Sequence, residues 1–206
     1  MTAPASLVVF LHGVGSSGRD LAPLAESWRA ALPGAAFALP DAPAPFERGP
    51  GRQWFSIAGV TDANRAPRIA AARAAFDATL RAIVVAQGFE GRLDRVALVG
   101  FSQGAIMALD ALASGRWPVG AVIAYAGRLG APASDPARAT PVLLVHGAAD
   151  PVIPAAETNR AAAALAAAGV AVESLILPGI GHAIAPEGAA AGLRFLAAAG
   201  LATARA

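Results

Sequence analysis

A serine between two glycines is the residue of this sequence that is most clearly arranged for chemistry. Ser102 lies at the centre of Gly100–Gly104, which has the sequence G-F-S-Q-G. The segment follows an apolar run, Val96–Val99, and precedes residues of helical composition. A G-x-S-x-G pattern between a strand and a helix is typical of a nucleophile elbow, which exposes the serine hydroxyl. Free N–H groups at the start of the next helix could stabilise a developing negative charge. An ordinary turn with a helix-capping serine is the alternative.

Of the three histidines, His182 is the predicted general base. A serine nucleophile requires such a base, and the base requires an acid that orients it. His182 lies in a glycine-containing loop after the last predicted strand, and it alone follows the candidate acid, as the chain order serine, acid, histidine requires. His12 and His146 each precede a glycine at the end of a predicted strand, and we interpret both as structural.

Asp150 is predicted as the acid that orients the base. It closely follows a predicted strand, Val142–His146, which places its carboxylate at a strand's carboxyl end. Asp110 lies inside a predicted helix and would point away, and Asp135 in a Ser-Asp-Pro loop better suits a turn or a helix cap. The predicted triad is Ser102, Asp150 and His182.

A glycine-rich segment near the start of the chain offers a competing interpretation. Gly13–Gly18, G-V-G-S-S-G, matches the dinucleotide-binding pattern G-x-G-x-x-G, and Asp41 lies at a suitable distance for a ribose-binding acid. An NAD-dependent oxidoreductase is therefore the alternative from a different class. Asp41 stands between prolines, however, and the chain has no lysine for the tyrosine–lysine pair of short-chain dehydrogenases. In a hydrolase the same segment would offer a backbone N–H to an oxyanion.

The composition narrows the classes of function. The chain has 206 residues, of which 56% are hydrophobic and 15% charged, with a net charge of +2. This predicts one domain, residues 1–206, with a substantial core. The arginines are scattered, which argues against nucleic-acid binding. Without cysteine there is no disulfide, thiolate metal site or cysteine nucleophile. No signal peptide is recognisable, and no apolar run is long enough for stable membrane insertion, so a cytoplasmic protein is expected.

Short apolar runs alternate with longer helical ones, which predicts a parallel sheet with helices on both faces. Strands are predicted over Leu7–His12, Ala35–Leu39, Val96–Val99, Val119–Tyr125, Val142–His146 and Val170–Leu177. Helices are predicted over Leu21–Leu32, Arg68–Gln87, a segment from the elbow to about Ser114, Ala155–Ala168 and Pro186–Ala198. Two long connections, Pro40–Ala66 and Ala126–Pro141, interrupt the pattern. In such sheets ligands bind beyond the carboxyl ends of the strands, where all of these motifs fall.

The order of these motifs resembles that of the phospholipase/carboxylesterase hydrolases, which include acyl-protein thioesterases and small bacterial carboxylesterases. The matching segments are Leu11–Gly15, Pro40–Pro43, Trp54-Phe55, Gly100–Gly104, His146–Pro154 and Gly181-His182. The resemblance implies an α/β-hydrolase fold, with a mostly parallel central sheet, helices on both faces and no large lid. It implies the same triad, an oxyanion hole made of the backbone N–H groups of Val14 and Gln103, and no metal or cofactor.

We therefore expect a serine hydrolase that cleaves carboxylic esters of short to medium acyl chains through an acyl-enzyme. A thioesterase or lysophospholipase with the same triad is the alternative. The expected partner is a small-molecule ester, and the assembly state, a homodimer included, is left open. The candidate substrate-contacting residues are Trp54, Phe55, Leu129, Val152 and Ile184, all expected on loops at the reactive edge.

Overall fold

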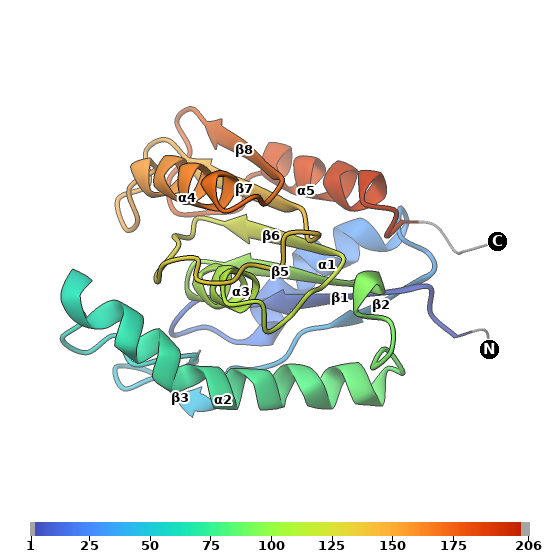
Figure 1. Cartoon of the computed structure of the whole chain (residues 1–206), viewed down its shortest axis with the longest axis horizontal. Coiled ribbons are helices and arrows are strands. Elements are labelled where there is room, and N and C mark those ends of the chain that lie inside the picture. The colour runs from blue at the N-terminus through green and yellow to red at the C-terminus, as the bar shows by residue number, and fades with distance from the viewer. Residues whose placement is uncertain (1–2, 203–206) are drawn as a thin grey trace.

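A parallel sheet forms the centre of the structure, a computed structural model that describes residues 3–202 (Figure 1). The strands are β1 (Ser6–Leu11), β2 (Ala35–Ala38), β5 (Val96–Phe101), β6 (Ala121–Tyr125), β7 (Val142–Gly147) and β8 (Val172–Leu177). Within the described residues they are ordered β2-β1-β5-β6-β7-β8, and every neighbouring pair is parallel. Two short strands, β3 (Ala44–Pro45) and β4 (Arg52–Gln53), form a separate antiparallel pair. Parallel strands send their carboxyl ends to one common edge, so the predicted motifs share that edge.

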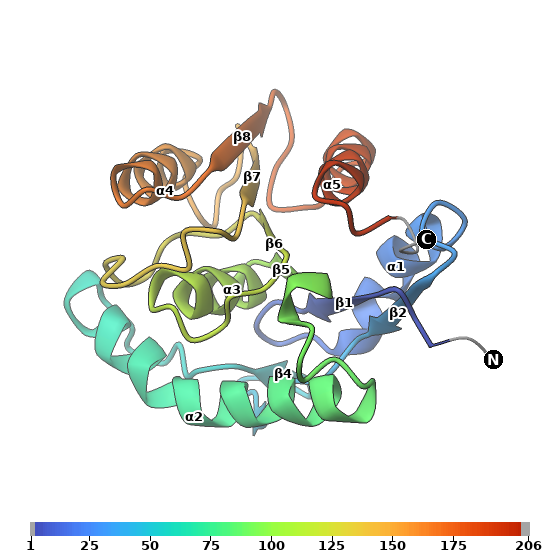
Figure 2. The same cartoon turned by 45° about the vertical axis from the view of Figure 1, so that its right-hand side comes forward.

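Helices cover both faces of this sheet (Figure 2). They are α1 (Ala22–Arg29), α2 (Asp62–Ala86), α3 (Gln103–Ala113), α4 (Ala156–Ala167) and α5 (Pro186–Ala198), with short 3-10 turns at Gly18–Leu21 and Leu93–Arg95. Buried side chains of α1 and α5 pack on one face, and those of α2, α3 and α4 pack on the other. The predicted arrangement is confirmed.

Strand β1 shows why the core has two halves. Leu7, Val9 and Leu11 pack on the side of α2 and α3, while Val8 and Phe10 pack on the side of α1. Alternate side chains of a strand point to opposite faces, and a parallel sheet covered by helices must be apolar on both. An uninterrupted apolar run was therefore the correct sequence signal for this strand.

The bounds of the predicted elements are largely confirmed, with one clear exception. Helix α5 has the predicted bounds, whereas α2 begins at Asp62, six residues before the predicted start. Thr61 caps α2, because its hydroxyl accepts the Asn64 N–H while the Asn64 side chain accepts the Thr61 N–H. Pro67 lies within the helix and does not end it. The long connection Pro40–Ala66 is correspondingly shorter and contains β3 and β4.

Candidate active site

Ser102 lies in a strained turn between β5 and α3. The strand ends at Phe101, the helix begins at Gln103, and Ser102 between them has φ 52° and ψ −113°. A positive φ is unfavourable for a residue with a side chain and is maintained only where its surroundings enforce it. One such restraint is the Ser102 N–H, which donates to the Tyr125 carbonyl at 2.9 Å. This geometry is that of a nucleophile elbow.

The glycines that flank the elbow leave no room for a side chain. A Cβ atom on Gly100 would lie 2.4 Å from the Ala105 nitrogen, and one on Gly104 would lie 2.0 Å from the Leu11 carbonyl oxygen. Both distances are shorter than any real Cβ contact. This turn therefore requires glycine on both sides, and the second glycine also lets α3 begin directly against the end of β1.

The structure brings the three predicted triad residues into one hydrogen-bonded chain. The Ser102 hydroxyl lies 2.9 Å from His182 Nε2, and His182 Nδ1 lies 2.7 Å from Asp150 Oδ2. Ser102 is 7% exposed and the His182 side chain 18% exposed, while the Asp150 side chain is buried. With Nδ1 donating to the carboxylate, His182 Nε2 is free to accept the serine proton.

The carboxylate of Asp150 is held by hydrogen bonds on both oxygens. Oδ2 accepts from His182, and Oδ1 accepts the backbone N–H groups of Val152 and Ile153 at 2.8 and 2.9 Å. Burial favours the neutral acid, but these hydrogen bonds outweigh it and hold the pKa of Asp150 below its ordinary value. Asp150 therefore carries a negative charge at neutral pH.

Two backbone N–H groups near Ser102 fit the expected oxyanion hole. Gln103 is the first residue of α3, where N–H groups lack an intrahelical acceptor, and Val14 lies in the loop after β1. Among residues 3–202, neither N–H has a hydrogen-bond acceptor. Gly13 brings the two loops together, because a Cβ atom on it would lie 3.3 Å from Ser102 Cβ. That these two N–H groups form an oxyanion hole stays a prediction, which this geometry supports.

The side chain of Gln103 has a role that the sequence analysis missed. Its Oε1 accepts the Trp54 N–H and its Nε2 donates to the Phe55 carbonyl, each at 2.7 Å. The buried amide thus joins the elbow helix to the loop before α2. A glutamine between the serine and the second glycine of the motif was the available signal, but its partner segment lies nearly fifty residues earlier.

The five candidate substrate-contacting residues occupy different environments. Ile184 borders a cavity of about 230 Å³ beside the elbow, and Val152 is 61% exposed on the loop that carries the acid. Leu129 is half-buried against the core. Trp54 and Phe55 are 3% and 7% exposed, and the Trp54 indole donates to the His12 carbonyl. For these two residues the structure favours core packing over an exposed wall, whereas Ile184 and Val152 remain accessible candidates.

In the glycine-rich segment after β1, a backbone N–H is hydrogen-bonded to Asp41, the residue considered as a ribose-binding acid. Asp41 Oδ1 accepts the Gly18 N–H at 2.8 Å, and a Cβ atom on Gly18 would lie 2.0 Å from the Leu39 carbonyl oxygen. Asp41 thus stabilises the loop internally, as a carboxylate at a helical N-terminus does. The spacing that suggested a dinucleotide site is explained by this contact.

The two other histidines are buried and hydrogen-bonded, as their structural interpretation requires. His12 Nδ1 donates to the Gly13 carbonyl at 2.7 Å, and its Nε2 accepts the Ala42 N–H at 2.9 Å. Burial lowers the pKa of His12, so its ring is neutral. His146 is bonded to Thr158 and to the Ile153 carbonyl.

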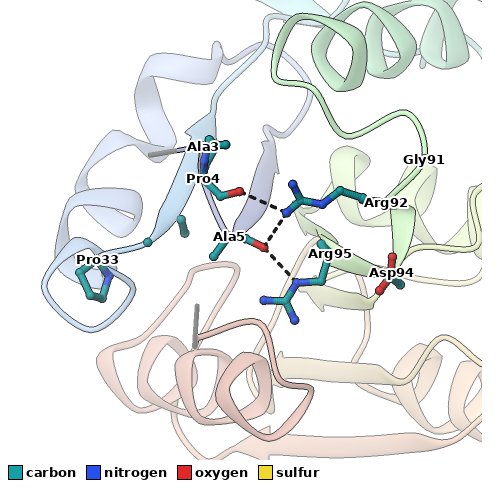
Figure 3. A pocket seen from close by; sticks show the side chains of 10 residues that line it. Ala3, Pro4, Ala5, Pro33, Gly91, Arg92, Asp94 and Arg95 are labelled. Carbon is teal, nitrogen blue, oxygen red and sulfur yellow. Dashed lines mark hydrogen bonds between the residues drawn. The ribbon is translucent and has the colours of Figure 1, made fainter. Parts of the chain in front are cut away.

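A cavity of about 790 Å³ lies away from this site, at the edge where strands β1, β2 and β5 begin. Figure 3 shows Arg92 and Arg95 donating to main-chain carbonyls, those of Pro4 and Ala5, and Arg95 also donates to the Gly200 carbonyl. These arginines fasten the beginning of β1. Within residues 3–202 no acidic, histidine or cysteine cluster could hold a metal ion, and no helix there has the length and apolarity to span a bilayer.

Comparison with known proteins decides the family. A family model described as Phospholipase/Carboxylesterase matches residues 2–199, nearly the whole chain. The chain belongs to the phospholipase/carboxylesterase family. The parallel sheet agrees with that membership, and the α/β-hydrolase fold that the resemblance implied is confirmed.

Several known proteins resemble this chain along most of its length. "Esterase YpfH" of Escherichia coli (strain K12) is 34% identical over 178 residues, which cover 86% of this chain and 76% of that protein. "Acyl-protein thioesterase 1" of Gibberella zeae is 28% identical over 87% of this chain and 84% of its own. Among solved structures, esterase PE8 superimposes with a TM-score of 0.86 at 35% identity, covering 95% of this chain and 93% of that one.

Proposed function

We propose that this protein is a serine hydrolase that cleaves carboxylic esters of short to medium acyl chains, with Ser102, His182 and Asp150 as its triad. The observation that carries the proposal is the hydrogen-bonded chain from the Ser102 hydroxyl through His182 to Asp150. Family membership and the esterases among its relatives support the same chemistry. The dinucleotide alternative has no comparable support.

In the first half of the reaction the substrate becomes attached to the enzyme. Ser102 Oγ attacks the ester carbonyl carbon as its proton passes to His182 Nε2, and Asp150 stabilises the imidazolium. The carbonyl oxygen becomes an oxyanion that the N–H groups of Val14 and Gln103 would stabilise. When the tetrahedral intermediate collapses, the carbon–oxygen bond breaks, and the alcohol leaves with the proton from His182.

In the second half water replaces the alcohol. His182 Nε2 accepts a proton from water, whose oxygen attacks the acyl carbonyl of Ser102. Collapse of this second intermediate releases the carboxylic acid and returns the proton to Ser102 Oγ. Neither half requires a metal or a cofactor.

The volume of the cavity beside the elbow supports a limit on the length of the acyl chain. At about 230 Å³ the cavity's volume is that of roughly seven water molecules, and it is lined by His12, Gly13, Ser16, Asp20, Leu21, Phe101 and Ile184. Such a volume accommodates a short or medium chain. Val152, two residues after Asp150, offers a separate exposed apolar contact.

A thioester substrate is the second candidate. It is favoured by similarity to proteins named acyl-protein thioesterase 1 from Gibberella zeae and Neurospora crassa, each 28% identical to this chain. The same triad can attack a thioester, because the attacked atom is again a carbonyl carbon.

Active-site labelling tests the proposal directly. A fluorophosphonate should modify the wild-type protein at Ser102, as mapped by mass spectrometry, and should leave Ser102→Ala unlabelled. Equal labelling of the two proteins, or none of either, would contradict a Ser102 nucleophile. Initial rates on p-nitrophenyl esters and matched acyl thioesters of two to twelve carbons would then give the leaving-group and chain-length preference.

A further inference from the structure

The residues behind Asp150 suggest how its carboxylate is held. His146 is the second-last residue of β7, and its side chain is fully buried. Its Nε2 lies 2.8 Å from the Ile153 carbonyl oxygen and 3.1 Å from Asp150 Oδ2, the oxygen that also faces His182. A second histidine thus contacts the proposed catalytic acid on the side away from the substrate.

The neighbours of His146 determine where its ring proton lies. Both atoms beside Nε2 are acceptors, a carbonyl oxygen and a carboxylate oxygen, so Nε2 must carry the proton. Nδ1 lies 2.8 Å from the Thr158 hydroxyl, which can donate. In the neutral ring Nδ1 is then the acceptor, so the Thr158 O–H donates to it, while the Nε2–H donates to Ile153 and lies against Asp150.

These contacts close the turn that carries the acid. Asp150 Oδ1 accepts the Ile153 N–H at 2.9 Å, while the Ile153 carbonyl accepts from His146. His146 thus binds one end of the turn through a carbonyl and contacts the other end through the Asp150 carboxylate. Thr158 belongs to the first turns of α4, so the network joins β7, the acid turn and that helix.

We infer that His146 is a positioning residue that acts through Asp150, with Thr158 holding its tautomer. The inference rests on the proposed triad. His146 itself does not touch substrate, because it is buried and both ring nitrogens are engaged. Its Nε2–H keeps the carboxylate oriented toward His182, so its loss should lower kcat and leave substrate binding unchanged.

Thr158 provides the sharper test, because two conservative variants separate its hydroxyl from its shape. Thr158→Val removes the donor to Nδ1 at nearly constant volume, and Thr158→Ser keeps it. We expect Thr158→Val to lower kcat on p-nitrophenyl butyrate roughly tenfold with KM unchanged, as loss of an orienting partner does. Thr158→Ser should stay close to wild type. Equal kcat values for the valine and serine variants would overturn the inference.

A double-mutant cycle distinguishes positioning from a general structural role. His146→Leu should lower kcat by roughly 10- to 100-fold in the wild-type background but by less than about threefold in Asp150→Asn, because the interaction it supports is already lost there. His146→Gln, which retains an N–H donor, should recover part of the activity. Circular dichroism and thermal unfolding would verify that each variant folds.

The outcomes separate this inference from the proposed function. Equal losses in the two backgrounds, or a change in KM alone, would refute positioning through Asp150 while Ser102 labelling of the wild type still supports the hydrolase. Failure of the wild type to be labelled at Ser102 would instead reject the triad on which the inference rests.

Discussion

At the scale of single residues, Gln103 combines two tasks that sequence motifs do not distinguish. Its backbone N–H is a candidate oxyanion donor at the start of α3, and its side chain holds the Trp54-Phe55 segment by two hydrogen bonds. That segment in turn bonds the His12 carbonyl through the Trp54 indole. One buried amide therefore connects the elbow, the loop before α2 and the loop after β1.

Replacing this amide should separate the two tasks. In Gln103→Met the backbone N–H remains, but the Trp54 N–H and the Phe55 carbonyl lose their buried partners. We expect the free energy of unfolding to fall by about 2 kcal/mol or more, measured by urea denaturation. Ser102 should still react with a fluorophosphonate at temperatures where the variant is folded.

Gln87→Met is the matched control, because Gln87 is exposed at the end of α2 and should tolerate the change. If the two variants lost equal stability, the hydrogen bonds of the Gln103 side chain would have no measurable role in stability.

At the scale of elements, the elbow depends on how closely α3 approaches β1. The first turn of α3 abuts the Leu11 carbonyl because residue 104 has no side chain. Further along the same helix, the buried Asp110 carboxylate pairs with Arg73 of α2 at 2.8 Å and with Arg116 at 3.0 Å. The helix is thus fixed at its beginning by close packing and near its end by charge. This pairing also explains why Asp110 cannot serve as the triad acid.

A methyl group at the close approach should displace the elbow. Gly104→Ala would place Cβ 2.0 Å from a carbonyl oxygen that belongs to the backbone and cannot rotate away. We expect a loss of about 1–3 kcal/mol in stability and a slower reaction of Ser102 with a fluorophosphonate.

The control for this variant is Gly91→Ala, where an added Cβ meets nothing within 4 Å. Wild-type stability and labelling rate in Gly104→Ala would show that the close approach is not required.

At the scale of the whole molecule, the two edges of the sheet have different roles. The carboxyl edge holds the elbow with Ser102, the turn that carries Asp150 and the loop that carries His182. At the opposite edge, arginines bind main-chain carbonyls around the start of β1. Between the two edges, the core buries ionisable side chains, and burial favours their neutral forms. His12 is one of these, since it is fully buried and its pKa is lowered.

The buried His12 predicts how stability depends on pH. Its folded pKa lies below the ordinary histidine value of about 6.5, so in that range the unfolded chain binds a proton that the folded protein does not. The contribution of His12 to stability is therefore complete above pH ~6.5. It is lost as the pH falls toward the folded pKa, by at most about 1.4 kcal/mol per pH unit.

Urea denaturation between pH 7.5 and 5.5 measures this effect. The wild type should lose stability over the interval, and His12→Gln, which does not titrate, should lose less. Identical pH slopes in the two proteins would mean that His12 does not couple folding to protonation.

Most of the fold could be predicted from the sequence, and so could the three residues that the structure joins in one hydrogen-bonded chain. The alternation of apolar runs and helical segments gave the parallel sheet, and chain order selected Asp150 and His182 for Ser102. The start of α2 could not be placed as well, because the cap at Thr61 lies before a proline and depends on a reciprocal contact between two side chains.

The sequence by itself determined the candidates for the proposed triad, because the glycine spacing around Ser102 and the order of Ser102, Asp150 and His182 can be read along the chain. Only the tertiary structure decided what supports them. It paired Gln103 with Trp54, Asp41 with Gly18, and His146 with Asp150 and Thr158, and it placed Trp54 and Phe55 in the core. These partners are joined by hydrogen bonds and packing between segments that meet only when the sheet assembles, and no periodicity along the chain encodes such contacts.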